Sequence, residues 1–339
     1  MRARLLLGLL LPLVACSAAP TPSTAEAPPA SADTPTVTAT APEPSGLELT
    51  VMSYNILKAN AKSKNYPWVP AKELAISARI PKLAQAIKYS DPDIAGLQEN
   101  EGSDPPPSAD LKPLLDDYGF VAEDTDVPIL FRRSAFKLVE SNHEYIGRKS
   151  ELSNYDRIVA WARLQHKDTG QELVVFNLHA FPFDEAKDAK LRSQSIDKLL
   201  DVMDTVNPGQ ATPFVLLGDF NAFNDETREV YRDHITKLAA VGIVDSANVA
   251  AVDASDVPGA STDHYMHATI GGKDYDKVVP ITNRHIDYIF VAESTPVASW
   301  AVVSGPGLAE KTVAGEQMDA WEGVVPSDHS PVVAKLTLG

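Results

Sequence analysis

The sequence predicts an α/β domain of packed β-sheets with helices on the outside, extending from about residue 47 to the C-terminus. Short apolar segments, either alternating with polar residues or rich in β-branched residues, recur along this region and are typical of strands. Between some of them, apolar residues recur at helical spacing. Apolar residues make up 44% of the 339-residue chain, which is enough to bury a sizeable core.

The expected elements follow in chain order. Residues 47–55 alternate and predict a strand, and the apolar positions of 76–87 recur at helical spacing. Further strands are expected at 93–97, 127–131, 158–165, 173–178, 214–217, 286–291 and 331–338. Helices are expected over 191–203 and 226–240. Two long polar stretches, 58–72 and 250–283, are expected to form loops at the mouth of a site or irregular surface.

The charge balance and the single cysteine limit the possible functions. The formal net charge is -16, so the protein repels polyanions at long range unless a local basic patch or bound cations reverse the field. This disfavours strong non-specific binding to nucleic acid, whereas carboxylates suit a divalent cation. Because Cys16 is the only cysteine, the folded region uses neither disulfides nor thiolate-bound zinc.

The first 46 residues indicate an export signal and a tether. Arg2 and Arg4 precede an apolar run, 5–14, that is too short to span a bilayer, and Leu13-Val-Ala-Cys16 resembles the lipobox of bacterial lipoproteins. We therefore expect a lipoprotein signal peptide over 1–15, lipidation of Cys16, and a disordered tether rich in Ala, Pro, Thr and Ser over 16–46. The protein would be exported and anchored to a membrane, on its periplasmic or cell-surface side. An ordinary secreted protein is the alternative.

Polar residues interrupt or end six of the apolar strands. In chain order they are Asn55, Glu99, Asn177 and His179, Asp219 and Asn221, Asp287, and Asp328 with His329. Each one alone has an ordinary explanation, as a turn residue, a helix cap or a structural histidine. Burying so many polar groups is costly unless they serve one another or a metal. Their number therefore indicates a functional site.

The chemistry of phosphoester hydrolysis fits these residue types. A cation must neutralise the charge that develops on the phosphorus centre, and Mg²⁺ prefers oxygen ligands such as Asn55, Glu99 and Asp328. The reaction also needs a base that activates water and a group that stabilises the leaving oxygen. Two histidines, each oriented by a carboxylate, can divide these tasks.

The ordered motifs resemble the endonuclease/exonuclease/phosphatase superfamily, which includes pancreatic-type deoxyribonuclease. The resemblance covers about 49–338. The motifs are Met52-Ser-Tyr-Asn55, Pro92-Asp-Ile-Ala-Gly-Leu-Gln-Glu99, Asn177-Leu-His179, Gly218-Asp-Phe-Asn221, Ile286-Asp-Tyr-Ile-Phe290 and Ser327-Asp-His329. The resemblance implies the deoxyribonuclease I-like fold, a four-layer sandwich of two packed mixed β-sheets with helices outside, over a domain that spans 47–339.

The resemblance also implies roles for individual residues. The metal ligands would be Glu99, the main one, with Asn55 and Asp328, and the ion would be Mg²⁺, with Mn²⁺ or Ca²⁺ as alternatives. Asp219 and Asn221 would position water and phosphate. His329 would be the general base, oriented by Asp287, and His179 would stabilise the phosphate or leaving oxygen. Arg157 and Asn177 would contact the substrate phosphate. Members of the deoxyribonuclease type orient the residue that matches His179 with a glutamate, for which the nearest candidate here is Asp126.

The sequence thus predicts an active, metal-dependent phosphoester hydrolase of the phosphodiesterase or nuclease class, expected as a monomer. The alternative within this class is a hydrolase of lipid or small-molecule phosphoesters rather than nucleic acid. A catalytically inactive binding module on the same scaffold is a different class, and it predicts the loss of a metal ligand or histidine. A purely structural lipoprotein does not explain six polar strand ends in this order.

Overall fold

The computed structural model describes residues 46–65, 71–149, 156–182, 186–222, 232–255, 261, 285–303, 308–313, 316–321 and 324–339. By its internal contacts the chain divides into two units, Met1–Glu43 and Pro44–Gly339, and all described residues belong to the second. The expected signal peptide, Cys16 and all but the last residue of the expected tether lie outside the described residues. Among the described helices, none is both long and apolar enough to cross a membrane.

Two six-stranded sheets form the centre of the domain, and both mix parallel and antiparallel pairs. The first contains, in spatial order, β11 (Val297–Val302), β14 (Val332–Leu338), β1 (Leu47–Asn55), β2 (Ile94–Gln98), β4 (Ile129–Arg132) and β3 (Tyr118–Val121). Only its β1–β2 pair is parallel. A separate hairpin is formed by β12 (Leu308–Val313) and β13 (Glu316–Trp321).

The second sheet contains, in spatial order, β5 (Phe136–Gly147), β6 (Arg157–His166), β7 (Glu172–His179), β8 (Phe214–Asp219), β10 (Asp287–Ala292) and β9 (Ile243–Asp245). Its only parallel pair is β7–β8. Each sheet therefore has one parallel pair near its centre, which brings the carboxyl ends of two strands to the same sheet edge.

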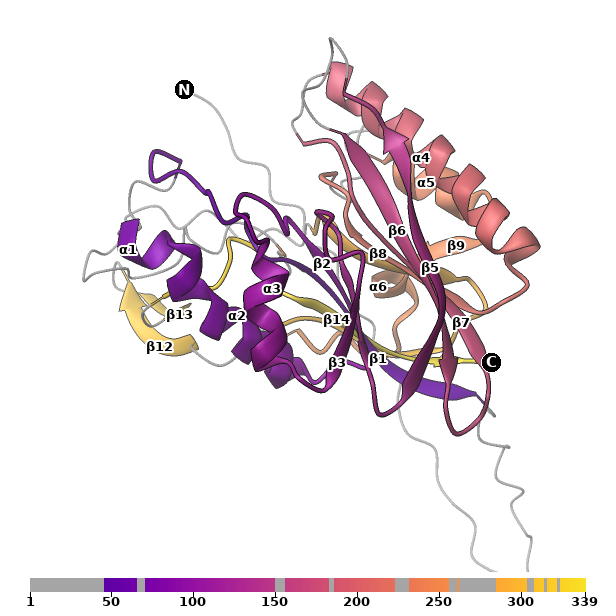
Figure 1. The fold of residues 1–339 in the computed structure, drawn as a ribbon, viewed down its shortest axis with the longest axis horizontal. Helices are drawn as coiled ribbons and strands as arrows, with labels where there is room; N and C mark the ends of the chain where they lie inside the picture. The colour runs from indigo at the N-terminus through magenta and orange to yellow at the C-terminus, as the bar shows by residue number, and fades with distance from the viewer. Residues whose placement is uncertain are drawn as a thin grey trace, which may run out of the picture. The chain divides into compact units, whose positions relative to one another are not determined.

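The helices cover the outer faces of the sheets (Figure 1). On the first sheet lie α2 (Ile76–Ser90) and α3 (Pro107–Leu111), and on the second lie α4 (Ala186–Val206) and α5 (Asp233–Ala239). Two short helices, α1 (Ala71–Leu74) and α6 (Ser246–Val249), and 3₁₀ turns at Lys112–Leu114 and Pro208–Gln210 complete the described elements. The apolar stripe predicted over 76–87 is the buried face of α2.

The main core lies between the sheets, where inward side chains of both pack together. It includes Val51 and Ile94 from the first sheet, and Val175, Leu217 and Ile289 from the second. The predicted architecture, two packed mixed sheets with helices outside, is thereby confirmed. Strands alternate their side chains, so each inward apolar residue also fixes which polar residues of the same strand face inward.

Candidate active site

Strand direction and register bring the polar strand ends together. β1 and β2 run parallel while β14 runs antiparallel to β1, so the ends of β1 and β2 meet the segment before β14. In the second sheet, His179 pairs with Asp219 and Asp219 pairs with Asp287, so the three lie in one row across β7, β8 and β10. Along each strand, these three residues occupy the same alternate positions as the residues of the main core, so their side chains also face the space between the sheets. They therefore lie at the edge of the space between the sheets.

His329 and Asp287 form a buried pair. The Nδ1 atom of His329 lies 2.8 Å from Oδ2 of Asp287, and its Nε2 atom lies 3.9 Å from Oδ2 of Asp219. The backbone N–H of His329 donates to Oγ of Ser327, whose hydroxyl donates to the carbonyl of Asn55. These contacts hold the imidazole against Asp287 and direct Nε2 toward Asp219.

Burial and proximity shift the protonation of this pair and of Asp219. Burial raises the pKa of Asp219 to about 7; the negative charge of Asp287 adds to this, while His329 opposes it. Burial by itself lowers the pKa of His329, but the charge and hydrogen bond of Asp287, with Asp328 and Asp219, raise it well above 6.5. In the absence of a cation, His329 therefore stays protonated at neutral pH.

His179 has a different environment on the opposite side of Asp219. Its Nδ1 atom lies 3.3 Å from Nη1 of Arg157, and its Nε2 atom lies 3.6 Å from Oδ2 of Asp219. A guanidinium only donates, so Nδ1 must accept and the neutral ring carries its proton on Nε2. Burial lowers the pKa of His179 well below 6.5, and the charges of Arg157, His329 and Lys58 lower it further. His179 is thus a neutral N–H donor.

Asp126 reaches His179 mainly through Arg157. Nη1 of Arg157 donates to Oδ2 of Asp126 at 3.2 Å, whereas that oxygen lies 3.9 Å from Nδ1 of His179. The sequence offers Asp126 as the nearest candidate for the carboxylate that orients His179. In the structure the arginine, rather than the carboxylate, is at hydrogen-bond distance from the ring.

The three predicted metal ligands gather around the turn that follows β1. Oδ1 of Asn55 accepts from the N–H of Leu57, and Oε2 of Glu99 accepts from the N–H of Lys58 at 2.8 Å. Asp328 lies in the same region: its Oδ1 atom is 3.4 Å from Oγ of Ser327, whose hydroxyl donates to the carbonyl of Asn55. Among the described residues, none donates a hydrogen bond to the other oxygen of Glu99. This oxygen-only donor set fits a hard cation such as Mg²⁺.

Asp219, Asp287 and His329 form a second possible cation group. Ligand atoms of Asp219, Asp287 and His329 lie within 4.8 Å of one another, and all three residues are buried. One of its members offers an imidazole, which Mg²⁺ uses less readily than oxygen, and the Nδ1 atom of that ring is already bonded to Asp287. The donor chemistry favours the oxygen set around Asn55.

Asn177 does not face a substrate, which corrects the sequence-based prediction. Its side chain is fully buried between the sheets, where Nδ2 donates to the carbonyls of Leu97 and Pro128, and Oδ1 accepts from Gln98. Asn177 and His179 share the inward face of β7 as predicted. His179 ends the strand, whereas Asn177 lies two residues before it, deeper between the sheets. Its amide joins the two sheets instead of binding phosphate.

Asn221 forms a turn directly after β8. Its N–H donates to Oδ1 of Asp219, and its Nδ2 donates to the carbonyl of Ala180. Its φ of 49° lies in the left-handed region, which asparagine tolerates better than most residues. The turn holds Asn221 beside Asp219. The predicted role of Asn221 in positioning water or phosphate stays a prediction.

Arg79 supports the site and was not predicted. This fully buried side chain of α2 donates to the carbonyls of Leu74, Ile56, Pro326 and Lys58. It thereby links the turn after β1 to the segment that carries Asp328 and His329. A signal was present in the sequence, because Arg79 is three residues after Ile76 and lies on the apolar face of the predicted helix.

Comparisons with known proteins agree with this architecture. The family model described as "Endonuclease/Exonuclease/phosphatase family" matches residues 52–329. A search of curated proteins found no match. A Bacteroides thetaiotaomicron protein of that family is 24% identical over 87% of this chain and 99% of its own, with a TM-score of 0.64.

Other similar structures have different substrates or ligands. A mannosyl-6-phosphatase from B. thetaiotaomicron is 24% identical over 85% of this chain and 99% of its own, with a TM-score of 0.61. D. rerio TDP2 in complex with a single-strand DNA product is 16% identical over 85% of this chain and 98% of its own, with a TM-score of 0.54. These structures share the fold, and the family match covers all six motifs. The chain therefore belongs to the endonuclease/exonuclease/phosphatase family.

Proposed function

We propose that the protein is a divalent-metal-dependent phosphoester hydrolase. The observation that carries the proposal is the row of His179, Asp219 and Asp287, completed by His329, beside an oxygen-only donor set. One histidine of this row is held by a carboxylate and favours the charged form, while the other is neutral and paired with an arginine. Environments that separate the protonation of two like residues are typical of acid–base sites.

In this proposal each side chain has a role of its own. Glu99, Asn55 and Asp328 would hold the cation, which would polarise the phosphate oxygens and neutralise their charge. Nδ1 of His329 bonds to Asp287, so in the neutral ring Nε2 carries no proton, faces Asp219 and would take a proton from a water placed between them. Nε2–H of His179 and the guanidinium of Arg157 face the same centre from the other side, as donors to a phosphate or leaving oxygen.

The fold does not choose the substrate. A mannosyl-6-phosphatase and a TDP2 bound to a DNA product share it, so nucleic acid and small phosphoesters both remain as substrate classes. An inactive binding module is disfavoured, because all predicted metal ligands and both histidines are present.

The test uses full-length protein with Mg²⁺, an EDTA control, supercoiled plasmid and p-nitrophenyl phosphate. We expect metal-dependent hydrolysis that His329→Ala lowers by about 10²–10⁴-fold. The matched control is His166→Ala, at the end of β6 and outside the site, which should retain full rate. Plasmid nicking would identify a nuclease, and phosphate release without nicking would identify a small-ester hydrolase. Well-folded protein that hydrolyses neither ester would overturn the proposal in favour of the binding module.

We also propose that Cys16 carries the lipid anchor of an exported, membrane-tethered protein. The lipobox-like Leu13-Val-Ala-Cys16 and the Pro-rich segment after it support this proposal. Mass spectrometry of the mature N-terminal peptide should find acylated Cys16, and Cys16→Ser should move the protein from the membrane fraction to the soluble fraction. An unmodified Cys16 within an uncleaved leader would contradict the anchor.

A further inference from the structure

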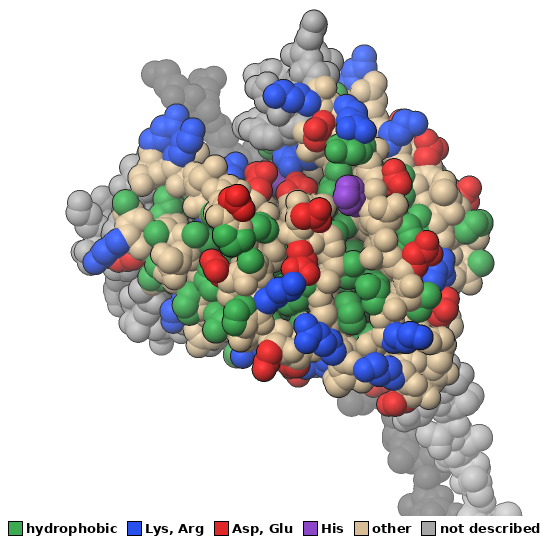
Figure 2. All heavy atoms as spheres, in the orientation of Figure 1, with side chains coloured by type: hydrophobic (Ala, Val, Ile, Leu, Met, Phe, Trp, Pro, Cys, Tyr) green, Lys and Arg blue, Asp and Glu red, His purple; other side chains and the backbone are tan. Residues whose placement is uncertain are grey.

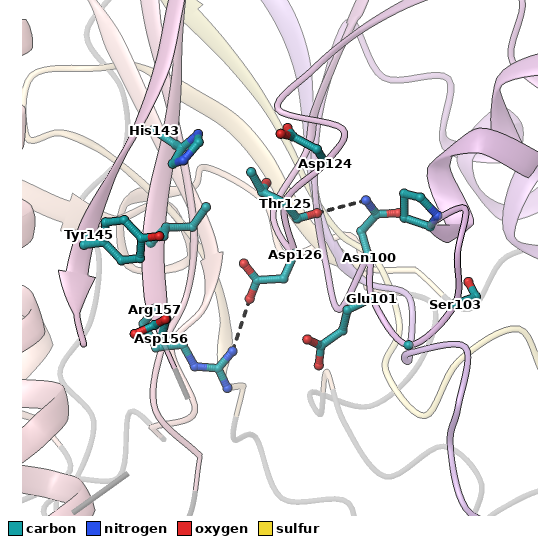
Figure 3. A pocket seen from close by; sticks show the side chains of 13 residues that line it. Asn100, Glu101, Ser103, Asp124, Thr125, Asp126, His143, Tyr145, Asp156 and Arg157 are labelled. Carbon is teal, nitrogen blue, oxygen red and sulfur yellow. Dashed lines mark hydrogen bonds and ion pairs between the residues drawn. The ribbon is translucent and has the colours of Figure 1, made fainter. Parts of the chain in front are cut away.

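A polar cavity opens beside the catalytic row. It encloses about 610 Å³, within the range of roughly 300–1,000 Å³ typical of small-ligand sites. One wall is the loop that follows β2, a second is the loop before β4, and the third is formed by β5 and the start of β6 (Figure 3). Its lining includes Glu101, Asp124, Asp126, Tyr145, Asp156 and Arg157.

Two residues of the cavity wall, Asp126 and Arg157, connect it to His179. Arg157 lines the cavity and is only 4% exposed, and its Nη1 atom lies between Oδ2 of Asp126 and Nδ1 of His179. Figure 3 shows the carboxylates of Asp126 and Glu101 directed toward this guanidinium from the opposite wall. A phosphate bound at Arg157 and His179 would therefore direct its ester oxygen toward the cavity.

Several polar groups of the cavity have no hydrogen-bond partner within the part of the chain that the structure describes. Among the described residues, none bonds to the carboxylates of Glu101 and Asp124 or to the hydroxyls of Ser103 and Tyr145. Burial raises the pKa of Asp126 to about 6, and the charge of Glu101 adds to this while Arg157 opposes it. The walls thus present both hydrogen-bond acceptors and donors to a ligand.

We propose that this cavity binds the alcohol part of a small phosphoester, and that this alcohol is uncharged and rich in hydroxyl groups. The inference rests on the proposed phosphoesterase function and names its substrate class. A hydroxyl group both donates and accepts, so it can donate to the carboxylates and accept from Tyr145, Ser103 or Arg157.

The charge of the walls argues against a polyanion. Four carboxylates, those of Glu101, Asp124, Asp126 and Asp156, face one arginine, so a second phosphate entering the cavity would be repelled. On the face shown in Figure 2, acidic side chains gather near the centre beside a histidine. The negative charges of these carboxylates would repel a nucleic-acid strand that extended from the catalytic centre through this cavity.

A cationic alcohol fits less well than a neutral one. An ammonium group only donates, so it cannot accept from the guanidinium of Arg157, and the two positive charges would repel each other. The guanidinium of Arg148 already lies 3.2 Å from the ring centroid of Tyr145, in the position that a ligand cation would take on that face of the ring.

The test compares two esters of the same shape with full-length protein and Mg²⁺. Hexose 6-phosphate carries ring hydroxyls, whereas cyclohexylmethyl phosphate has none. We expect kcat/KM to be about 10–100-fold higher for the hexose ester, since sites that hydrogen-bond hydroxyls reject analogues lacking them. Glu101→Ala and Asp124→Ala should each lower this ratio several-fold, while Glu140→Ala, an exposed carboxylate on β5 outside the cavity, should leave it unchanged.

The outcomes separate this inference from the proposed function. Hydrolysis of p-nitrophenyl phosphate with equal kcat/KM for the two ring esters would overturn the inference and leave the phosphoesterase intact. A preference for phosphocholine or for a dinucleotide over the hexose ester would also overturn it. Absence of metal-dependent hydrolysis with every ester would overturn the proposed function, and this inference with it.

Discussion

At the scale of single residues, the two histidines have the same chemistry but opposite environments. His329 contacts a buried carboxylate, which favours the imidazolium, whereas His179 contacts a buried guanidinium, which opposes it. Both side chains are buried, so solvent screens these interactions little. The neighbours, rather than the histidines, thus decide which ring favours the charged form and which ring stays neutral.

This contrast predicts that the pKa values of the two histidines shift in opposite directions. In the metal-free protein, ¹H–¹⁵N spectra of the imidazole nitrogens should show His329 titrating above pH 6.5 and His179 remaining neutral below it. Arg157→Met should raise the pKa of His179, because it removes a positive charge next to Nδ1. Two histidines that both titrate close to 6.5 would contradict the assigned environments.

The position of the cation can also be tested with single residues. If the oxygen set around Asn55 holds Mg²⁺, Glu99→Gln should lower the affinity for Mg²⁺ by roughly 10–100-fold or more. Mutating residues that only bond to metal ligands already lowers metal affinity by that factor, and Glu99 would be a ligand itself. Asp287→Asn should then lower turnover while leaving affinity nearly unchanged. Calorimetric titration of both variants measures this, and the reverse pattern would place the ion at the group of Asp219, Asp287 and His329.

At the scale of elements, Arg79 of α2 connects two strand-end segments. Replacing it with methionine leaves buried carbonyls of Ile56, Lys58 and Pro326 without their donor. Each unsatisfied group costs about 1–3 kcal/mol, so we expect Arg79→Met to lower the free energy of unfolding by about 3 kcal/mol or more. Urea denaturation measures this. Arg133→Met, which removes one exposed bond to Asp116, is the matched control and should cost well under 1 kcal/mol.

The close approach of the two sheets depends on Gly96 in β2. A Cβ atom at this position would lie 2.6 Å from Oδ1 of Asn177 and 3.0 Å from Cβ of Leu217. Gly96→Ala should therefore destabilise the protein by about 1–3 kcal/mol through overpacking. Combining it with Asn177→Ala should cost less than the sum of the single changes, and strictly additive costs would show that the two sites do not touch.

At the scale of the whole molecule, buried acids couple stability to pH. The pKa of Asp219 rises on folding from 3.8 to about 7, so its contribution is present at low pH and lost as pH rises through 7. His329 acts in the same direction and His179 in the opposite one, since its folded pKa is lowered. We expect the free energy of unfolding of the metal-free protein to fall by about 1–2 kcal/mol between pH 6 and pH 8.

Metal addition supplies the control for this pH dependence. A bound cation favours ionised carboxylates, so saturating Mg²⁺ should reduce the loss of stability between pH 6 and pH 8 and raise stability by mass action. Asp219→Asn should weaken the dependence without metal. Urea denaturation series at pH 6, 7 and 8 measure both effects, and a stability that rises from pH 6 to pH 8 without metal would contradict them.

Much of the fold was predictable because its central strands are apolar. The predicted strand over 47–55 coincides with β1, and the segments expected at 173–178 and 214–217 lie within β7 and β8. By contrast, β5 was missed. It is an edge strand whose side chains from Lys137 to Tyr145 are mostly exposed, with irregular register at Leu138/Glu140 and Tyr145/Gly147, so it has no apolar alternation.

The sequence by itself determined the fold class, the family and the inward-facing polar residues of the site, because apolar periodicity and motif order are local properties of the chain. Only the tertiary structure decided which groups serve one another. It placed Arg157 beside His179 and Asn177 between the sheets, and showed that Arg79 links separate loops. Such partners are distant along the chain: the hydroxyl of Ser327 and the carbonyl of Asn55 are 272 residues apart. Their pairing follows from sheet register and packing, which no local pattern specifies.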